Sequence, residues 1–153
     1  MGSQGRKIYK LDRKEMRVRG KIEEIAAAVV RMAGLQIAPR CKPFTVICKY
    51  AVGTGVGPHT DSDFNSLVDT IVSMTMNGHA SFCIKGPKGW RQMWLGGGDR
   101  VVFDRSLLHR VSGAIQERVN TTVRFALEDA NGVFIWPKWY TPEDGDSEQG
   151  GEV

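Results

Sequence analysis

The stretch Arg118-Val119-Asn120-Thr121-Thr122-Val123-Arg124-Phe125 decides the fold of this sequence. Successive side chains of a β-strand point to opposite faces, and the residue types here alternate with that period of two. One face carries two arginines, an asparagine and a threonine, whereas the other carries two valines, a threonine and a phenylalanine. The alternation predicts a strand with one apolar and one polar face. Out of context, such a polar face is typical of a strand that faces water.

Short apolar or alternating runs on both sides of this stretch predict further strands, because clusters of glycine and proline separate them. The runs are Phe44–Tyr50, Leu67–Met76, Ala80–Ile84, Gln92–Leu95, Arg100–Phe103, Arg118–Leu127 and Val133–Trp136. The Gly-rich segment Ala51–Pro58 is expected to be a loop. Apolar residues recur along one stripe from about Lys21 to Met32, which predicts a helix that stops near Gly34. Many short strands and one leading helix indicate an α+β chain built around a β-sandwich or barrel.

Length and composition indicate one globular domain. The chain has 153 residues, of which 41% are hydrophobic and 25% charged, as in ordinary soluble proteins. No apolar run is long enough to cross a membrane, and the polar, basic N-terminus is unlike a secretory signal. The three cysteines, Cys41, Cys48 and Cys83, are odd in number and lack Cys-x-x-Cys spacing. They argue against a disulfide framework and a zinc knuckle, and favour an intracellular location, cytoplasmic or nuclear.

Charge is distributed unevenly around a net value of +4. Eight basic residues lie between Arg6 and Lys21, against Asp12 and Glu15. Such an arm can attract phosphates, although a solvated helix face is the commoner meaning of the pattern. The segment from Pro142 carries five acidic residues and no basic one, which predicts disorder. Four tryptophans are candidates for core packing or for base stacking, namely Trp90, Trp94, Trp136 and Trp139.

The tripeptide His59-Thr60-Asp61 is the best candidate for a metal site. In an extended chain its imidazole and carboxylate point to the same side, so both can bind one ion. His109 is the best candidate for a third ligand, whereas His79 lies beside the probable turn Asn77-Gly78 and is expected on the surface. Two imidazoles and one carboxylate on one face of a metal form the triad of non-haem Fe(II) oxygenases. A zinc site would be expected to use more Cys or His ligands.

The two arginines of the decisive strand suit a carboxylate cosubstrate. The three open positions at such an iron can take a chelating cosubstrate and O₂. Arginine grips a carboxylate with two parallel hydrogen bonds and stays charged. Arg118 and Arg124 lie about 20 Å apart along an extended strand, so curvature or side-chain reach has to bring them to one small molecule.

From about Lys21 to Leu127, the order and spacing of several motifs resemble the AlkB-like Fe(II)/2-oxoglutarate-dependent dioxygenases. The motifs are Tyr50-Ala51-Val52-Gly53 followed nine residues after the tyrosine by His59-Thr60-Asp61, Ile71-Val72-Ser73-Met74-Thr75-Met76, Gly98-Asp99-Arg100-Val101-Val102-Phe103, Leu108-His109-Arg110-Val111, and Arg-x-Asn-x-Thr-x-Arg from Arg118 to Arg124. The resemblance implies a double-stranded β-helix, or jelly roll, with an N-terminal helix packed on it. It also implies a basic arm over residues 1–20, a dioxygenase domain over 21–140 and an acidic disordered tail over 141–153.

The resemblance also implies a role for each matching residue. His59, Asp61 and His109 would hold Fe(II). Arg118 would pair with the distal carboxylate of 2-oxoglutarate, helped by Tyr50 and Asn120, and Arg124 would sit near the carboxylate that chelates iron. Asp63 matches an acidic residue that approaches the exocyclic amine of the substrate base. The implied reaction is oxidative demethylation of N-alkylated bases in single-stranded RNA or DNA, with release of formaldehyde, succinate and CO₂.

Two departures from the family pattern leave the substrate open. The family usually has asparagine where this chain has Cys48, which removes one hydrogen-bonding group from the cosubstrate pocket. Only some 20 residues precede the predicted helix, so a full nucleotide-recognition lid is expected to be absent or reduced. The alternatives are a hydroxylase of protein or small-molecule substrates on the same scaffold, and a catalytically inactive module that binds nucleic acid.

Overall fold

The computed structural model describes residues 6–9, 16–36, 41–61, 69–113 and 115–135. Within these ranges the chain forms one helix and a series of antiparallel strands. They are β1 (Arg6–Tyr9), α1 (Met16–Met32), β2 (Cys41–Tyr50), β3 (Val56–His59), β4 (Thr70–Asn77), β5 (Ala80–Gly86), β6 (Gly89–Leu95), β7 (Arg100–Asp104), β8 (His109–Val111) and β9 (Arg118–Leu127).

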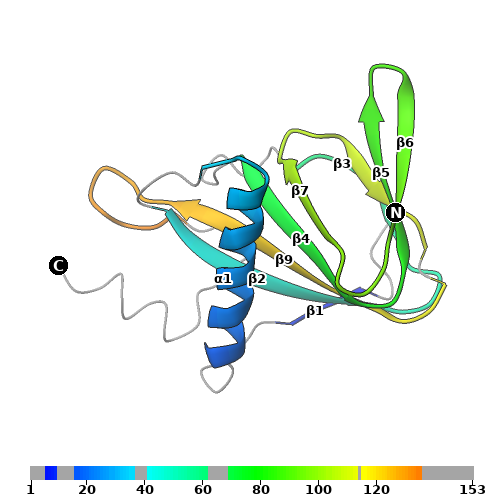
Figure 1. Ribbon diagram of the computed structural model, residues 1–153, viewed down its shortest axis with the longest axis horizontal. Helices are drawn as coiled ribbons and strands as arrows, with labels where there is room; N and C mark the ends of the chain where they lie inside the picture. Colours follow the sequence, from blue (N-terminus) through cyan, green and yellow to red (C-terminus); the bar gives the residue numbers. More distant parts are fainter. Residues whose placement is uncertain (1–5, 10–15, 37–40, 62–68, 114, 136–153) are drawn as a thin grey trace.

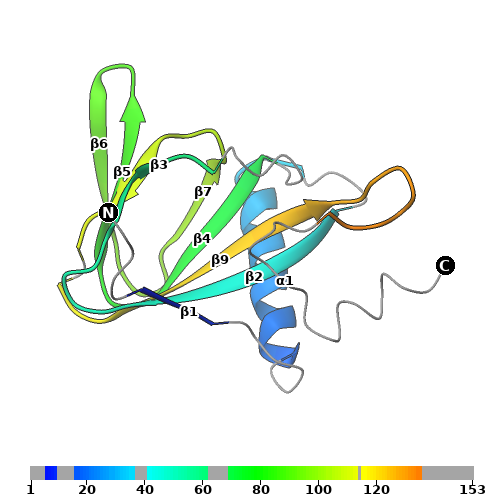
Figure 2. The same cartoon turned by 180° about the vertical axis from the view of Figure 1, so that it is seen from behind.

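The strands form two sheets that face each other, with α1 on the outer side of the larger one (Figure 1). The larger sheet has the order β1-β2-β9-β4-β7, and the smaller sheet has the order β3-β8-β5-β6. Seen from behind, β2 and β9 run side by side along the larger sheet, and the β5–β6 hairpin projects from the smaller one (Figure 2). This architecture is the predicted jelly roll with a helix packed on it.

β9 lies at the centre of the larger sheet, where it pairs with β2 from Tyr50↔Arg118 to Cys41↔Leu127 and with β4 on its other side. Its apolar face packs under the helix. The hydrophobic cluster there joins residues of α1, β4 and β9, namely Ile22, Ala26, Val30, Val72, Met74, Val123 and Phe125. The opposite face of β9 lines the space between the two sheets. The predicted alternation of this strand is therefore confirmed.

Three elements differ from the sequence-based expectation. The helix begins at Met16, not near Lys21, and β1 joins the larger sheet, so both lie partly or wholly within the segment predicted as a basic arm. The early turns of the helix lack an apolar stripe but contain good helix formers, which periodicity alone does not detect. β3 forms inside the segment predicted as a loop. Its glycine and proline signal a turn, but an edge strand tolerates a proline because one of its sides needs no N–H donor.

The last predicted strand is reduced to a single bridge between Glu128 and Phe134. Trp136, Trp139 and the predicted acidic tail lie outside the described residues, as do most of the side chains of the predicted basic arm. In the part of the chain that is described, no helix is both long and apolar enough to span a membrane.

Replacing Phe125 with alanine tests the packing of β9 under α1. Phe125 is 2% exposed in the core cluster, and removing such a ring leaves a cavity that costs about 3–5 kcal/mol of unfolding free energy. We expect a matching fall in the urea unfolding midpoint. Met32→Ala is the control, because Met32 on the same helix is 85% exposed and its loss should change stability by less than about 0.5 kcal/mol.

Candidate metal centre and adjoining pocket

His59, Asp61 and His109 meet at one point between the two sheets. His59 ends β3 and His109 begins β8, and the two residues are paired across the β3–β8 ladder. Asp61 follows His59 by two residues, as the His-x-Asp pattern requires. One ligand atom from each of the three residues lies within 4.8 Å of the others. The predicted convergence of the three side chains is thus confirmed, and the group can bind a metal ion.

Both imidazoles are oriented by the same kind of hydrogen bond. The Nδ1 atom of His59 lies 2.8 Å from the carbonyl oxygen of Gly57, and that of His109 lies 2.8 Å from the carbonyl oxygen of Leu107. A carbonyl oxygen can only accept, so Nδ1 is the donor in each ring and Nε2 carries the free lone pair. The Nε2 atoms lie 3.8 and 4.0 Å from the two carboxylate oxygens of Asp61. Each ring therefore presents a ligand atom toward Asp61.

The turn between β7 and β8 positions Asp61 and His109, the two candidate ligands that lie outside β3. The N–H of Asp61 donates to the carbonyl oxygen of Arg105 over 2.8 Å. The guanidinium of Arg105 lies 2.8 Å from the carboxylate of Asp69, and Ser106 donates from its N–H and hydroxyl to Asp104. These bonds from Ser106 lower the pKa of Asp104. The same turn also supplies the Leu107 carbonyl, so one structured segment holds both Asp61 and His109.

Phe82 on β5 and Phe103 on β7 form an apolar wall beside His109. Their ring centroids lie 5.5 and 4.8 Å from that of His109. Burial in this environment lowers the pKa of His109, which favours the neutral form that a metal needs. The sequence analysis did not identify these phenylalanines as site residues, although strand alternation could have placed both on the inner face.

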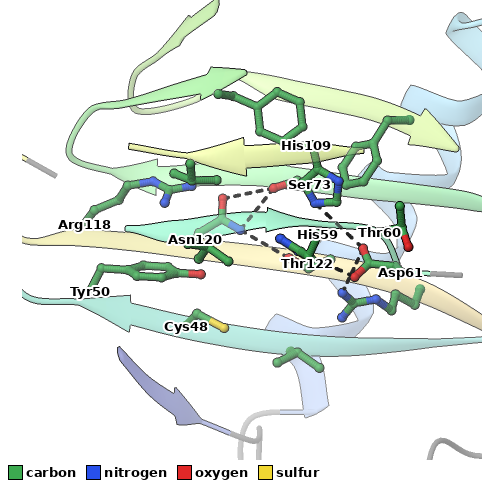
Figure 3. A pocket seen from close by; sticks show the side chains of 16 residues that line it. Cys48, Tyr50, His59, Thr60, Asp61, Ser73, His109, Arg118, Asn120 and Thr122 are labelled. Carbon is green, nitrogen blue, oxygen red and sulfur yellow. Dashed lines mark hydrogen bonds and ion pairs between the residues drawn. The ribbon is translucent and has the colours of Figure 1, made fainter. Parts of the chain in front are cut away.

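The triad lies at one end of a cavity of about 620 Å³ between the sheets. Most of its polar wall comes from three adjacent strands of the larger sheet. The residues are Cys48 and Tyr50 on β2, Ser73 on β4, and Arg118, Asn120, Thr122 and Arg124 on β9. All four predicted cosubstrate residues therefore face one cavity, and Figure 3 shows Tyr50 and Arg118 on the side away from Asp61.

Arg118 is a buried cation at the far end of the cavity. Its guanidinium lies 5.0 Å from the centre of the Tyr50 ring, and burial lowers its pKa. The Nε atom is buried and has no hydrogen-bond partner among the residues that the structure describes. A buried guanidinium of this kind is suited to an anion that enters the cavity.

Asn120 lies between the two ends of the cavity, and its amide group is hydrogen-bonded to neighbouring side chains. Its amide nitrogen donates to the hydroxyl oxygens of Ser73 and Thr122 over 3.1 and 3.2 Å, and the Ser73 hydroxyl lies 3.2 Å from the amide oxygen. Ser73 belongs to a recognised motif, but the sequence analysis gave it no role. Arg124 lies at the metal end, 3.4 Å from Asp61, so the two arginines of β9 serve opposite ends of the cavity.

Two glycines allow the chain on either side of the site to pack closely. A side-chain carbon at Gly55 would lie 2.5 Å from the carbonyl oxygen of Val111, and one at Gly113 would lie 2.7 Å from that of Gly53. Only glycine fits at these two positions without a shift of the backbone. The two glycines therefore allow the start of β3 to pack against the end of β8.

Two further residues named in the sequence analysis are not part of the triad as described. His79 is exposed, as expected, and its ring contacts the side chain of Gln116 at 3.3 Å. Asp63 lies outside the described residues, so its predicted contact with substrate stays a prediction. Cys41, Cys48 and Cys83, all within the described part of the chain, form no disulfide.

Comparison with known proteins supports the fold. The sequence matches no protein-family model and no curated protein. A prolyl-4-hydroxylase from Pseudomonas putida superposes with a TM-score of 0.62 at 16% identity, over 82% of this chain and 73% of that chain. A cupin domain from Bordetella pertussis (TM-score 0.42, 18% identity, 59% of this chain and 86% of that one) and an oxalate oxidase in complex with glycolate (0.49, 16%, 88% and 56%) are more distant. The jelly roll is thus shared with the prolyl-4-hydroxylase.

Metal titration of Asp61→Asn tests the triad. Loss of the anionic ligand should weaken binding of Mn(II), measured by calorimetry, more than about 100-fold, because even residues that only support metal ligands contribute 10- to 100-fold. His79→Ala is the matched control, since it removes an exposed imidazole outside the triad. Equal Mn(II) affinity of Asp61→Asn and the unaltered protein would contradict the assignment.

Proposed function

We propose that this protein is an Fe(II)- and 2-oxoglutarate-dependent dioxygenase that demethylates N-alkylated bases in single-stranded nucleic acid. The observation that carries the proposal is one cavity with a two-histidine, one-carboxylate group at one end and the buried Arg118 at the other. A dicarboxylate cosubstrate requires both features, because one of its ends chelates a metal and the other needs a fixed cation.

The donor set fits Fe(II). Two neutral imidazoles and one carboxylate form the facial triad typical of non-haem iron oxygenases, and they leave positions for a cosubstrate and O₂. Both imidazoles have their Nδ1 atoms bound to backbone carbonyls, so Nε2 is the ligand atom of each ring. His59, Asp61 and His109 would hold the metal, while Arg124 beside Asp61 would orient that carboxylate.

The polar wall fits 2-oxoglutarate. Arg118 would pair with the distal carboxylate, and the phenol of Tyr50 lies beside it on the neighbouring strand. Asn120 would line the middle of the cosubstrate and, because its two N–H groups are bound to Ser73 and Thr122, would hold those hydroxyls in place. Cys48 pairs with Asn120 on the neighbouring strand and lines the same cavity. The cavity wall therefore carries a thiol at the position where the AlkB-like family usually has an asparagine amide.

When bound, Fe(II) with 2-oxoglutarate and O₂ supplies an oxidant for C–H bonds, and the coproducts are succinate and CO₂. One oxygen atom of O₂ enters succinate and the other enters the substrate. A hydroxylated N-methyl group then breaks its C–N bond, giving formaldehyde and the free base. The chain's own contribution is to orient the ligands, to bind the dicarboxylate and to exclude water from the metal with Phe82 and Phe103.

The order of the AlkB-like motifs and the basic residues between Arg6 and Lys21 support a nucleic-acid substrate. Asp63 would contact the exocyclic amine of the base. A base within a duplex would have to be extruded, so a single strand is the simpler substrate. The rival function is hydroxylation of a protein or small molecule on the same scaffold.

Two products measured in one reaction test the proposal. Protein loaded with Fe(II) is incubated with 2-oxoglutarate and an N-methylated single-stranded oligonucleotide, and succinate and formaldehyde are quantified. We expect both products in equal amounts, and neither with Asp61→Asn. Succinate without formaldehyde would reject the nucleic-acid substrate in favour of the rival hydroxylase. The absence of succinate with any substrate would reject the dioxygenase itself.

Replacing Arg118 with lysine tests the cosubstrate site. A lysine keeps the charge but cannot reproduce a two-bond grip on a carboxylate, and a hydrogen bond to a charged group contributes about 1.5–3 kcal/mol. The KM for 2-oxoglutarate should therefore rise about 10-fold or more in the succinate assay. Arg100→Lys, at an exposed position on β7, is the control and should leave KM unchanged. An unaltered KM for Arg118→Lys would remove Arg118 from the site.

A further inference from the structure

The outer face of the smaller sheet is separate from the cavity. Phe82 and His109 point inward, so Arg110, which follows His109 on β8, points to the other side. On β6, Trp90 and Trp94 share this outer side, because they alternate with Met93, which pairs with Phe82. The outer face therefore carries two tryptophans beside an arginine.

Trp94 borders a groove of about 680 Å³ on this outer face. Its side chain is 63% exposed, so it does not serve the core packing that is usual for tryptophan. Along β5 and β6 the groove is lined by Ser81, Cys83 and Gln92, and Arg110 lies on its β8 side. An exposed aromatic ring beside such a groove offers a flat surface for stacking.

The indole ring of Trp90 contacts two cationic side chains. The guanidinium of Arg110 lies 4.4 Å from the centre of the indole ring, and the Nζ atom of Lys85 lies 5.7 Å from it. These cation–π contacts hold the charged groups on the outer face of the sheet. Two fixed positive charges therefore lie on the same face as Trp94.

Within the described stretch from residue 70 to residue 98, no acidic side chain offsets this charge. Residues 70–98, which include the whole β5–β6 hairpin, contain no aspartate or glutamate, whereas the hairpin adds Lys88 at its turn to Lys85. Glu117, just before β9, is already paired with Lys49 at 3.1 Å. The hairpin and the neighbouring strand β8 are therefore complementary to a polyanion.

We infer that this outer face binds single-stranded nucleic acid, with a base stacked on Trp94 and phosphates bound by Lys85 and Arg110. Stacking needs an unpaired base, and a positively charged groove with aromatic rings is the usual way to bind a single strand without sequence preference. A membrane surface fits less well, because a lipid-binding face needs a broad apolar area and here Ser81 and Gln92 lie next to Trp94.

This binding face goes beyond the proposed function and does not depend on it, because it lies on the opposite side of the sheet from the metal ligands. It would nevertheless serve that function. Val56 and Val111 line both the cavity and the outer groove, so the two sites are one sheet apart near β3 and β8. A strand held on the outer face would keep its flanking bases at high local concentration near the cavity.

The experiment measures binding of unmodified, fluorescently labelled single strands of about 12 nucleotides, a length within the usual site sizes. RNA and DNA are titrated separately by anisotropy at several salt concentrations, without iron or 2-oxoglutarate. Trp94→Ala should weaken binding about 5- to 100-fold, as expected for the loss of one stacked base. Lys85→Gln and Arg110→Gln should each lower the slope of log affinity against log salt by about 0.7.

Two control variants on α1 make the result specific. Arg31→Gln removes an exposed cation and Met32→Ala removes an exposed apolar side chain on the far side of the larger sheet. Both should bind like the unaltered protein. An unchanged affinity of Trp94→Ala and Arg110→Gln, or an equal loss in Arg31→Gln, would overturn the inference. So would Trp94-dependent binding to vesicles of anionic phospholipid without binding to either oligonucleotide.

The two proposals can fail independently. Loss of oligonucleotide binding in Trp94→Ala together with no succinate from any substrate would support this face and reject the dioxygenase. Formaldehyde release from a methylated strand, unaffected by Trp94→Ala and Arg110→Gln at low substrate concentration, would support the dioxygenase and reject this face.

Discussion

The two-sided alternation of β9 is the constraint on which the rest of the structure depends. Each residue of this strand must serve either the core under α1 or the polar wall of the cavity, because neighbouring side chains point to opposite faces. A slip of one residue in its pairing with β2 would bury Arg118 under the helix and expose Phe125 to the cavity. The hydrophobic core thus fixes the register, and the register places the charged groups of the site.

The site itself divides into parts with different supports. The larger sheet supplies a polar wall in which β9 pairs with β2 along its whole length and with β4 in one register from Val72 to Thr75, so Tyr50, Asn120 and Ser73 are placed by backbone hydrogen bonds. The smaller sheet carries His59 and His109, and the turn at Asp104–Leu107 positions Asp61 and His109 through its backbone carbonyls. Arg124 joins the two halves, because it comes from the larger sheet and lies beside Asp61. An ion pair across the gap between sheets therefore couples the metal end to the cosubstrate wall.

The sequence predicted those features that depend on residue type and short spacing. The strand Arg118–Leu127 has the predicted bounds, because its alternation is uninterrupted. His59, Asp61 and His109 converge as predicted, since a His-x-Asp pair in extended chain needs only one distant partner. Phe82, Phe103 and Ser73 were missed as site residues, because assigning them requires knowledge of which face of each strand meets the opposite sheet. β3 was missed because its pairing partner lies some 50 residues away and its glycine and proline resemble a turn.

The position of His59 on β3 would govern how a bound metal ion exchanges with the solvent. β3 is an edge strand of four residues, and its pairing with β8 has an irregular register between Val56 and His59. Short edge segments open at a small fraction of the free energy of global unfolding. Asp61 and His109, whose side chains are 7% and 5% exposed, are hydrogen-bonded to the turn between β7 and β8, whereas His59, at 36%, lies toward solvent. The residence time of a metal would therefore follow the opening of one strand, and a chelator would strip the ion from an otherwise folded protein.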